Sequence, residues 1–142
     1  MIQIKAIIAD DEEPLRTYLR SLLSDVWPDL IICGEARNGK EALEQVEKHK
    51  PHIAFLDIKM PGLSGMEVAK RIGQACCVVF ITAYDRYAVE AFENEAIDYL
   101  LKPVTRERLE RAVKRLQKQI DAPHGQPPSD ISEITERILA GE

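Results

Sequence analysis

The sequence predicts an α/β protein whose core is a parallel five-stranded sheet covered by helices on both faces. Short apolar runs alternate with segments of helical spacing, which is the pattern of repeated βαβ units. The first run, residues 4–9, lacks the alternation of a half-exposed strand, as expected for a strand buried on both faces. A chain of 142 residues that is 45% apolar can form one domain with a substantial core.

The first half of the chain is predicted to contain three strands and two helices. Leucines at helical spacing mark a helix that begins near Glu13, and the segment Trp27-Pro28-Asp29 ends it. The second helix stops before Pro51, because proline cannot continue a helix. The elements in order are strand 4–9, a helix from residue 13, strand 30–34, helix 39–48 and strand 52–56.

The second half continues the same alternation. Turn-forming residues from Met60 to Gly65 separate the third strand from a short helix, and the next strand is rich in β-branched residues. Thr105 can cap the last helix, whose apolar positions recur every three or four residues. The elements are helix 66–72, strand 78–82, helix 87–94, strand 96–101 and a helix from Thr105 to about residue 120.

The composition changes at the C-terminal end of the predicted domain, residues 1–120. Residues 121–130 hold three prolines and no large apolar side chain, which indicates a linker. Residues 131–142 regain helical spacing, and Asp130 with Glu133 resembles a capping box. A helix this short is marginal alone, so we expect this segment to start a connection to a missing domain.

Charge and hydropathy exclude several classes of function. A formal charge of -5 argues against unaided nucleic-acid binding, which usually shows as a basic excess. No stretch reaches the length of a membrane span, and the N-terminus lacks the layout of a signal peptide. We therefore expect a cytoplasmic protein with no membrane contact.

Reactive side chains gather where the predicted strands end. In an open parallel sheet the functional site lies beyond the carboxyl ends of the strands, so these residues should converge on one rim. The second strand ends in Gly34-Glu35 with nothing distinctive, as expected for an edge strand outside the site. The residues at the other strand ends are Asp10 and Asp11 after the first, Asp57 after the third, Thr82 at the fourth and Lys102 after the fifth.

Three carboxylates this close repel each other unless a cation lies among them, and Mg²⁺ prefers such oxygen ligands. A carboxylate beside the cation can attack phosphorus and form an acyl phosphate. Lys102 can neutralise charge on the transferred group, and the Thr82 hydroxyl can donate to a phosphoryl oxygen. We predict no histidine or further carboxylate at a strand end to act as a base for hydrolysis, so the acyl phosphate should persist.

Each of these residues also has a plain structural interpretation. The Asp10-Asp11 pair could cap a helix, and Asp57 could be an ordinary turn residue. Thr82 could serve β propensity, and Lys102 could be a solvated surface lysine. Their joint placement at the ends of neighbouring strands favours a functional site.

Four groups of residues stand out at the predicted strand ends. They are Asp10-Asp11, Asp57 followed by Ile58-Lys59-Met60-Pro61-Gly62, Thr82-Ala83 and Tyr99-Leu100-Leu101-Lys102-Pro103. In combination they resemble the receiver domain of two-component response regulators, over about residues 1–120. The resemblance implies a flavodoxin-like (βα)5 fold, a doubly wound parallel sheet with strand order 2-1-3-4-5.

The resemblance implies that Asp57 accepts a phosphoryl group from a sensor histidine kinase. It also implies that Mg²⁺, or Mn²⁺, is bound by Asp11, Asp57 and the backbone carbonyl of Lys59, with Asp10 helping through a water molecule. By the same resemblance, the domain phosphorylates itself and slowly loses the phosphoryl group, and it is not an enzyme with a separate substrate.

The resemblance assigns the remaining site residues as well. Thr82, Ala83 and Lys102 would contact the phosphoryl group, and the small Ala83 leaves access to it. Lys102 would precede a cis-proline, Pro103. Thr82 and Tyr99 would form a switch pair: the hydroxyl moves toward the phosphoryl group and the Tyr99 ring enters the space it leaves. That change would repack the face made by residues 87–94, strand 96–101 and the last helix.

Residues 87–99 resemble more particularly the receivers that precede a LytTR-type DNA-binding domain, the LytR/AlgR subfamily. That effector domain is absent from the sequence, so we expect a truncated piece of a transcription regulator that contacts DNA only through the missing part. Phosphorylation would favour a homodimer through the repacked face, although the same charges also suit a solvated helix. The charged residues are Arg106, Arg108, Arg111, Lys114, Arg115 and Lys118, opposite Glu90, Glu93 and Glu95.

Two other classes use similar residues. The haloacid dehalogenase phosphohydrolases form an aspartyl phosphate on an α/β sheet, but their nucleophile lies in a D-x-D motif after the first strand, where this chain has Asp10-Asp11-Glu12. A pseudo-receiver binds partners without phosphorylation and usually lacks one acidic residue or the lysine. Both remain alternatives to the phosphorylation-driven switch.

Overall fold

A computed structural model describes residues 3–121 of the chain. Five strands form one sheet in the order β2-β1-β3-β4-β5, and every neighbouring pair is parallel. The predicted fold class and strand order are therefore confirmed. The strands are β1 (Lys5–Ala9), β2 (Ile31–Ala36), β3 (Ile53–Leu56), β4 (Cys77–Thr82) and β5 (Asp98–Leu101).

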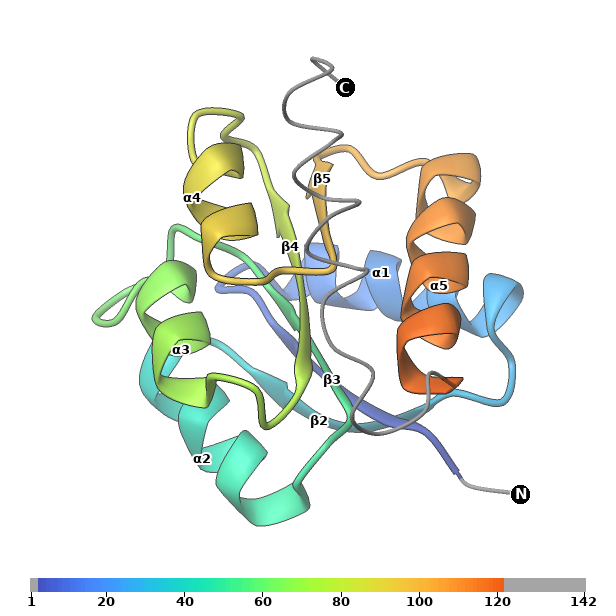
Figure 1. The fold of residues 1–142 in the computed structure, drawn as a ribbon, viewed down its shortest axis with the longest axis horizontal. Coiled ribbons are helices and arrows are strands. Elements are labelled where there is room, and N and C mark those ends of the chain that lie inside the picture. Colours follow the sequence, from blue (N-terminus) through green and yellow to red (C-terminus); the bar gives the residue numbers. More distant parts are fainter. Residues whose placement is uncertain (1–2, 122–142) are drawn as a thin grey trace.

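The helices cover both faces of the sheet, with α1 and α5 on one face and α2, α3 and α4 on the other (Figure 1). This arrangement follows from the alternation of strands and helices, because each crossover between parallel strands carries a helix to one face or the other. The helices are α1 (Glu13–Val26), α2 (Gly39–His49), α3 (Gly65–Ile72), α4 (Ala88–Glu93) and α5 (Arg106–Asp121). None of these described helices has the length and apolar character needed to cross a bilayer.

The central strands divide their side chains between two apolar cores. Ile53 and Phe55 of β3 pack toward α1 and α5, whereas Ala54 and Leu56 pack toward α2, α3 and α4. All four β3 residues are buried, since successive side chains of a strand point to opposite faces and both faces are covered. Residue 57, which follows directly, is thus carried to the sheet rim on a rigid strand.

Some element boundaries differ from the predictions. Strand β2 continues to Ala36, beyond the predicted end at Gly34, because β1 pairs with it through Ile8↔Glu35 and Ala9↔Ala36 after a register shift. Helix α5 includes Asp121, which the prediction assigned to the linker. The rest of the predicted linker, residues 122–130, and the predicted connecting segment, residues 131–142, lie outside the described residues.

The start of α3 packs against the end of β3. The Gly65 N–H donates to the Ile58 carbonyl at 2.8 Å. A Cβ atom at Gly65 would lie 1.9 Å from the Asp57 carbonyl oxygen, whereas one at Gly34 would meet only the flexible side chains of Gln45 and His49. Glycine at residue 65 therefore lets helix α3 approach the backbone of Asp57.

We predict that Gly65→Ala lowers the free energy of unfolding by about 1–3 kcal/mol, the usual cost of overpacking. Gly34→Ala should cost less, because the Gln45 side chain can move away from the added methyl group. Urea denaturation of the two variants checks this. Equal losses of stability would contradict the close approach of α3 to Asp57.

Candidate functional site

The Lys102 side chain lies between two carboxylates at the carboxyl ends of the strands. Its Nζ is 2.7 Å from Asp10 Oδ2, which follows β1, and 2.8 Å from Asp57 Oδ2, which follows β3. All three side chains are at most 14% exposed. The sheet order brings them together because β1 and β3 are neighbours and β5 continues into Lys102 at the same rim.

The Lys102 ammonium offsets part of the negative charge of the two carboxylates. Burial of Lys102 by itself lowers the pKa of its ammonium group, but hydrogen bonds to Asp10 and Asp57 outweigh burial and raise that pKa above its ordinary value. Lys102 is therefore a cation in this structure, and it offsets the repulsion between two buried carboxylates. A ligand that withdraws Lys102 from one carboxylate has to supply positive charge in its place.

The backbone of Asp57 is held by the sheet. Its N–H donates to the Ala9 carbonyl at 2.9 Å, which extends the β1–β3 ladder by one residue. Its Oδ1 accepts from the Ile58 N–H at 2.6 Å, and its Oδ2 faces Lys102. Both carboxylate oxygens are thus anchored in a side chain that is only 7% exposed. The Asp57 carboxylate therefore has a fixed orientation toward any ligand that approaches the ends of the strands.

A candidate cation site lies beside this pair. Among the described residues, one ligand oxygen each from Asp10, Asp11 and Glu12 lie within 4.8 Å of one another. Asp57 does not belong to this group, although it shares the Lys102 ammonium with Asp10. These oxygen donors fit a hard divalent cation such as Mg²⁺. The structure brings together part of the predicted ligand set and adds Glu12.

A further carboxylate lies near this group. Glu12 Oε2 is 3.9 Å from Lys102 Nζ, and the Glu12 side chain is 62% exposed. Glu12 is also the N-cap residue of α1, where an acidic residue complements the helix dipole. That no carboxylate at a strand end acts as a base for hydrolysis stays a prediction.

Thr82 ends β4 with a buried hydroxyl group that has no hydrogen-bond partner. Its backbone is fixed, since its carbonyl accepts from the Lys102 N–H at 2.9 Å. A buried hydroxyl without a partner costs about 1–3 kcal/mol, so its retention calls for an explanation outside stability. Ala83, the next residue, is exposed and adds little bulk to the rim. The Thr82 hydroxyl is thus a donor with no acceptor among the described residues.

The Tyr99 side chain lies along the same edge of the sheet. Its hydroxyl donates to the backbone carbonyl of Tyr84, and its ring packs on Phe80 with the ring centroids 6.2 Å apart. Burial raises the pKa of the Tyr99 hydroxyl above its ordinary value, so this group stays protonated. Register pairs Phe80 with Tyr99 and Thr82 with Leu101, so the predicted switch pair lies on adjacent strands.

The other predicted residues have the following places. The Lys102–Pro103 peptide bond is cis. The Lys59 side chain is exposed, and its Nζ lies 5.5 Å from the Tyr84 ring centroid and 5.8 Å from that of Tyr87. Lys59 therefore forms cation–π contacts beside the rim, in addition to any role of its backbone carbonyl.

Some charges proposed for a dimer contact are bound within the chain. Asp98, which is 1% exposed, accepts from Arg108 at 2.6 and 2.9 Å and lies 3.0 Å from Arg115. On the side of α4, Glu90 pairs with Lys70 at 3.3 Å. These contacts fasten α5 to β5 and α4 to α3, so a dimer contact would have to use the other charges or exchange these partners.

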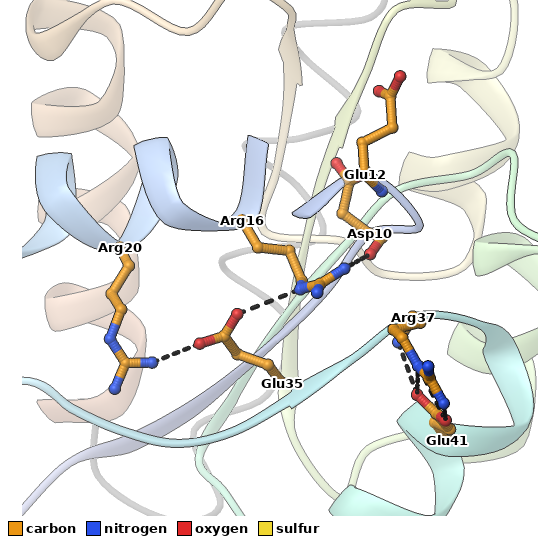
Figure 2. Close-up of polar contacts among 7 residues, drawn as sticks. All are labelled: Asp10, Glu12, Arg16, Arg20, Glu35, Arg37 and Glu41. Carbon is orange, nitrogen blue, oxygen red and sulfur yellow. Dashed lines mark hydrogen bonds and ion pairs between the residues drawn. The ribbon is translucent and has the colours of Figure 1, made fainter. Parts of the chain in front are cut away.

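Sequence reasoning missed two residues near the acidic group. Arg16 of α1 is buried, and it contacts both the Asp10 backbone and the Glu35 side chain, as Figure 2 shows. The sequence gives no signal for a role of Glu35, because it lies at the end of an edge strand outside the predicted site. The available signal was an arginine in the apolar stripe of α1, where Arg16, Leu19 and Leu23 share the buried face.

Residues 6–114 match the family described as the response regulator receiver domain. The chain therefore belongs to the receiver family of two-component response regulators, and the fold agrees with it.

Several relatives carry the same domain. An uncharacterized response regulatory protein of Vibrio cholerae is 48% identical over 91% of this chain and 50% of its own length. The transcriptional regulatory protein BtsR of Salmonella typhi is 44% identical over 82% of this chain and 49% of its length. The sensory transduction protein LytT of Oceanobacillus iheyensis is 41% identical over 84% of this chain and 50% of its length. The chain spans about half the length of these relatives.

A solved structure has the same fold. The response regulatory domain of the protein mrkE from Klebsiella pneumoniae superposes with a TM-score of 0.76 at 34% identity, covering 82% of this chain and 97% of that domain. The described part of the chain is thus comparable to a whole receiver domain.

We predict that Thr82→Val raises the free energy of unfolding by about 1 kcal/mol, because it removes a buried hydroxyl that has no partner. Thr105→Val is the matched control and should lower stability by about 1 kcal/mol, because the Thr105 hydroxyl accepts from the Arg108 N–H at the start of α5. Thermal denaturation in metal-free buffer measures both. A loss of stability in Thr82→Val would show that its hydroxyl is satisfied in the resting protein.

Proposed function

We propose that this chain receives a phosphoryl group on Asp57 from a sensor histidine kinase and thereby acts as a molecular switch. The observation that carries the proposal is the joint placement of a buried Asp57, a cationic Lys102 and the unpartnered Thr82 hydroxyl at the end of the sheet. These groups supply a nucleophile, a counter-charge and a hydrogen-bond donor, which together are what an aspartyl phosphate requires. The domain is regulatory in this role, and it belongs in the cytoplasm, where kinases have access to ATP.

The chemistry divides among the side chains. An Asp57 carboxylate oxygen attacks phosphorus, a new O–P bond forms, and the P–N bond to the kinase histidine breaks. The Lys102 ammonium, already 2.8 Å from Asp57, can turn toward a phosphoryl oxygen and neutralise its charge. The Thr82 hydroxyl can then donate to another phosphoryl oxygen, which gives it the partner that it lacks at rest. Ala83 leaves the approach open.

The acidic residues suit a bound Mg²⁺ or Mn²⁺ ion. Asp11, Asp57 and the backbone carbonyl of Lys59 would hold it, with Asp10 acting through a water molecule. When bound, the cation neutralises charge on the phosphoryl oxygens. The clustering of Asp10, Asp11 and Glu12 supports such a site, and Glu12 is a further candidate ligand through water. Release of Asp57 from Lys102 accompanies its turn toward the cation in this proposal.

The output runs through the face made by α4, β5 and α5. Movement of Thr82 toward the phosphoryl group would free space beside Phe80. The Tyr99 ring can enter this space once the hydrogen bond from the Tyr99 hydroxyl to the Tyr84 carbonyl breaks. We propose that this repacking favours a homodimer through the α4-β5-α5 face. In the full-length protein it would control a LytTR-type DNA-binding domain and hence transcription. Relatives named LytT and transcriptional regulatory protein BtsR support that assignment.

Incubation with Mg²⁺ and acetyl phosphate should add one phosphoryl group, visible by intact mass and removed by hydroxylamine, which cleaves acyl phosphates. Asp57→Asn should accept none, because the amide is not a nucleophile. Asp25→Asn, an exposed change on α1, is the matched control and should accept one. The proposal fails if Asp57→Asn is still labelled, and sustained release of phosphate from generic esters would favour the phosphohydrolase alternative.

Beryllofluoride, which mimics an aspartyl phosphate, should convert the chain to a dimer in the presence of Mg²⁺. Sedimentation velocity at several concentrations measures this change of mass. Asp57→Asn should remain in its resting state under the same conditions. A wild-type chain that binds beryllofluoride and keeps its resting mass would rule out phosphorylation-driven dimerisation.

A further inference from the structure

Arg16 occupies an unusual place for a charged residue. It lies on the buried face of α1 with Leu19 and Leu23, and it is only 8% exposed. Arginine is seldom buried to this extent unless its charge is paired, because desolvation of the guanidinium is costly. Its partners, drawn in Figure 2, are Asp10 at the end of β1 and Glu35 at the end of β2, and Asp10 is itself part of the acidic group.

One arm of Arg16 holds the turn that carries the acidic residues. Its Nη1 donates to the Asp10 carbonyl oxygen at 2.6 Å. This carbonyl belongs to the planar peptide that joins Asp10 to Asp11, so holding it constrains the backbone of both acidic residues.

The other polar groups of Asp10 are also engaged. The Asp10 N–H donates to the Ala36 carbonyl at 3.0 Å, and Oδ1 accepts from the Glu12 N–H at 2.9 Å. Oδ2 is 2.7 Å from Lys102 Nζ. Arg16 is therefore the side chain that completes the fixation of this residue, at the carbonyl that no strand neighbour holds.

A second carboxylate holds Arg16 in place. Glu35 Oε1 accepts from Arg16 Nε at 3.1 Å, and Glu35 Oε2 accepts from Arg20 Nη1 at 2.5 Å. Glu35 is positioned by the pairing of Ile8 with Glu35 in the β1–β2 ladder. The planar guanidinium reaches Asp10 and Glu35 in different directions at once, which a lysine ammonium on a flexible stem does not reproduce.

We propose that Arg16 is a positioning residue for the divalent cation, and that Glu35 orients Arg16 for this purpose. The inference rests on the proposed function, because it assumes that Asp10 and Asp11 take part in binding the cation. Residues that orient metal ligands typically change metal affinity by about 10–100-fold when they are replaced. The edge strand β2 thus contributes to the site through Glu35, although none of its side chains is in the proposed ligand set.

A purely electrostatic role and a positioning role of Arg16 predict opposite changes in cation affinity when Arg16 is replaced. If Arg16 acted only through its positive charge, Arg16→Met would bind the cation more tightly, because a repelling charge would be lost. If it orients the Asp10–Asp11 peptide, the same variant binds more weakly. The sign of the change therefore separates positioning from simple electrostatics.

The test is Mn²⁺ binding to the full 142-residue chain, measured from the electron paramagnetic resonance signal of free Mn²⁺. Arg16→Met should raise the dissociation constant at least about 10-fold. Arg16→Lys, which keeps the charge, and Glu35→Gln, which loosens Arg16, should each raise it by a smaller factor. Circular dichroism confirms that each variant is folded at the temperature used.

The chain offers a matched control in the ion pair Arg37–Glu41, in which Arg37 is exposed, Glu41 is partly exposed and the two charged groups are 2.8 Å apart (Figure 2). Arg37→Met and Glu41→Gln make the same changes of charge nearby, and they should leave the dissociation constant within about twofold of wild type, since the pair does not contact Asp10. A structural role alone would lower the melting temperature of Arg16→Met equally with and without Mn²⁺. Positioning also reduces the rise in melting temperature that Mn²⁺ produces.

The outcomes separate the two levels of the proposal. A wild-type chain that binds no Mn²⁺ overturns the proposed function and the role of Arg16 together. A wild-type chain that binds Mn²⁺, with Arg16→Met binding equally or more tightly, overturns the role of Arg16 alone. If Arg16→Met does not fold, Arg16→Lys and Glu35→Gln provide the test. The positioning role is overturned if their dissociation constants for Mn²⁺ are no higher than that of the control Glu41→Gln.

Discussion

The contact of the Lys102 ammonium with Asp10 and Asp57 is the interaction on which the rest of the site depends. Two carboxylates buried side by side repel each other, and a single cation 2.7 and 2.8 Å away makes their burial tolerable. Replacing such a buried pair by apolar residues is often neutral for stability, so the group is better explained by function than by folding. The group holds two carboxylates at a position where a cation could bind and a phosphoryl group could be transferred.

The sheet topology builds this contact at the carboxyl ends of the strands. Asp57 and Asp10 extend the ladders of β3 and β1 by one residue each, toward Ala9 and Ala36 respectively. On the other side, Thr82 and Tyr99 lie on the paired strands β4 and β5, and the Tyr99 ring packs on Phe80 of β4. Asp98, next to Tyr99, is bound by Arg108 and Arg115, which gives this face a fixed support on α5.

The sequence was sufficient for the fold and for the convergence of the site, because both follow from local signals. Apolar runs and turn formers predicted the alternation of strands and helices, and the reactive residues at four strand ends predicted the meeting of Asp57 with Lys102. The strand order was predicted by the resemblance to receiver domains. What it could not supply was long-range pairing. The end of β2 depends on a register shift against β1, and this shift gives Glu35 its role. The importance of Arg16 likewise depends on partners six and nineteen residues away, which no local pattern reveals.

Asp57 is paired with Lys102 and lies outside the acidic group of Asp10, Asp11 and Glu12. We propose that cation binding draws Asp57 away from Lys102 and into the same site. Anomalous diffraction from crystals soaked in Mn²⁺ tests this directly. We expect one manganese peak within coordination distance of the carboxylates of Asp11 and Asp57, with Lys102 withdrawn from Asp57. A peak bonded to Asp11 and Glu12, with Asp57 still paired to Lys102, would contradict it.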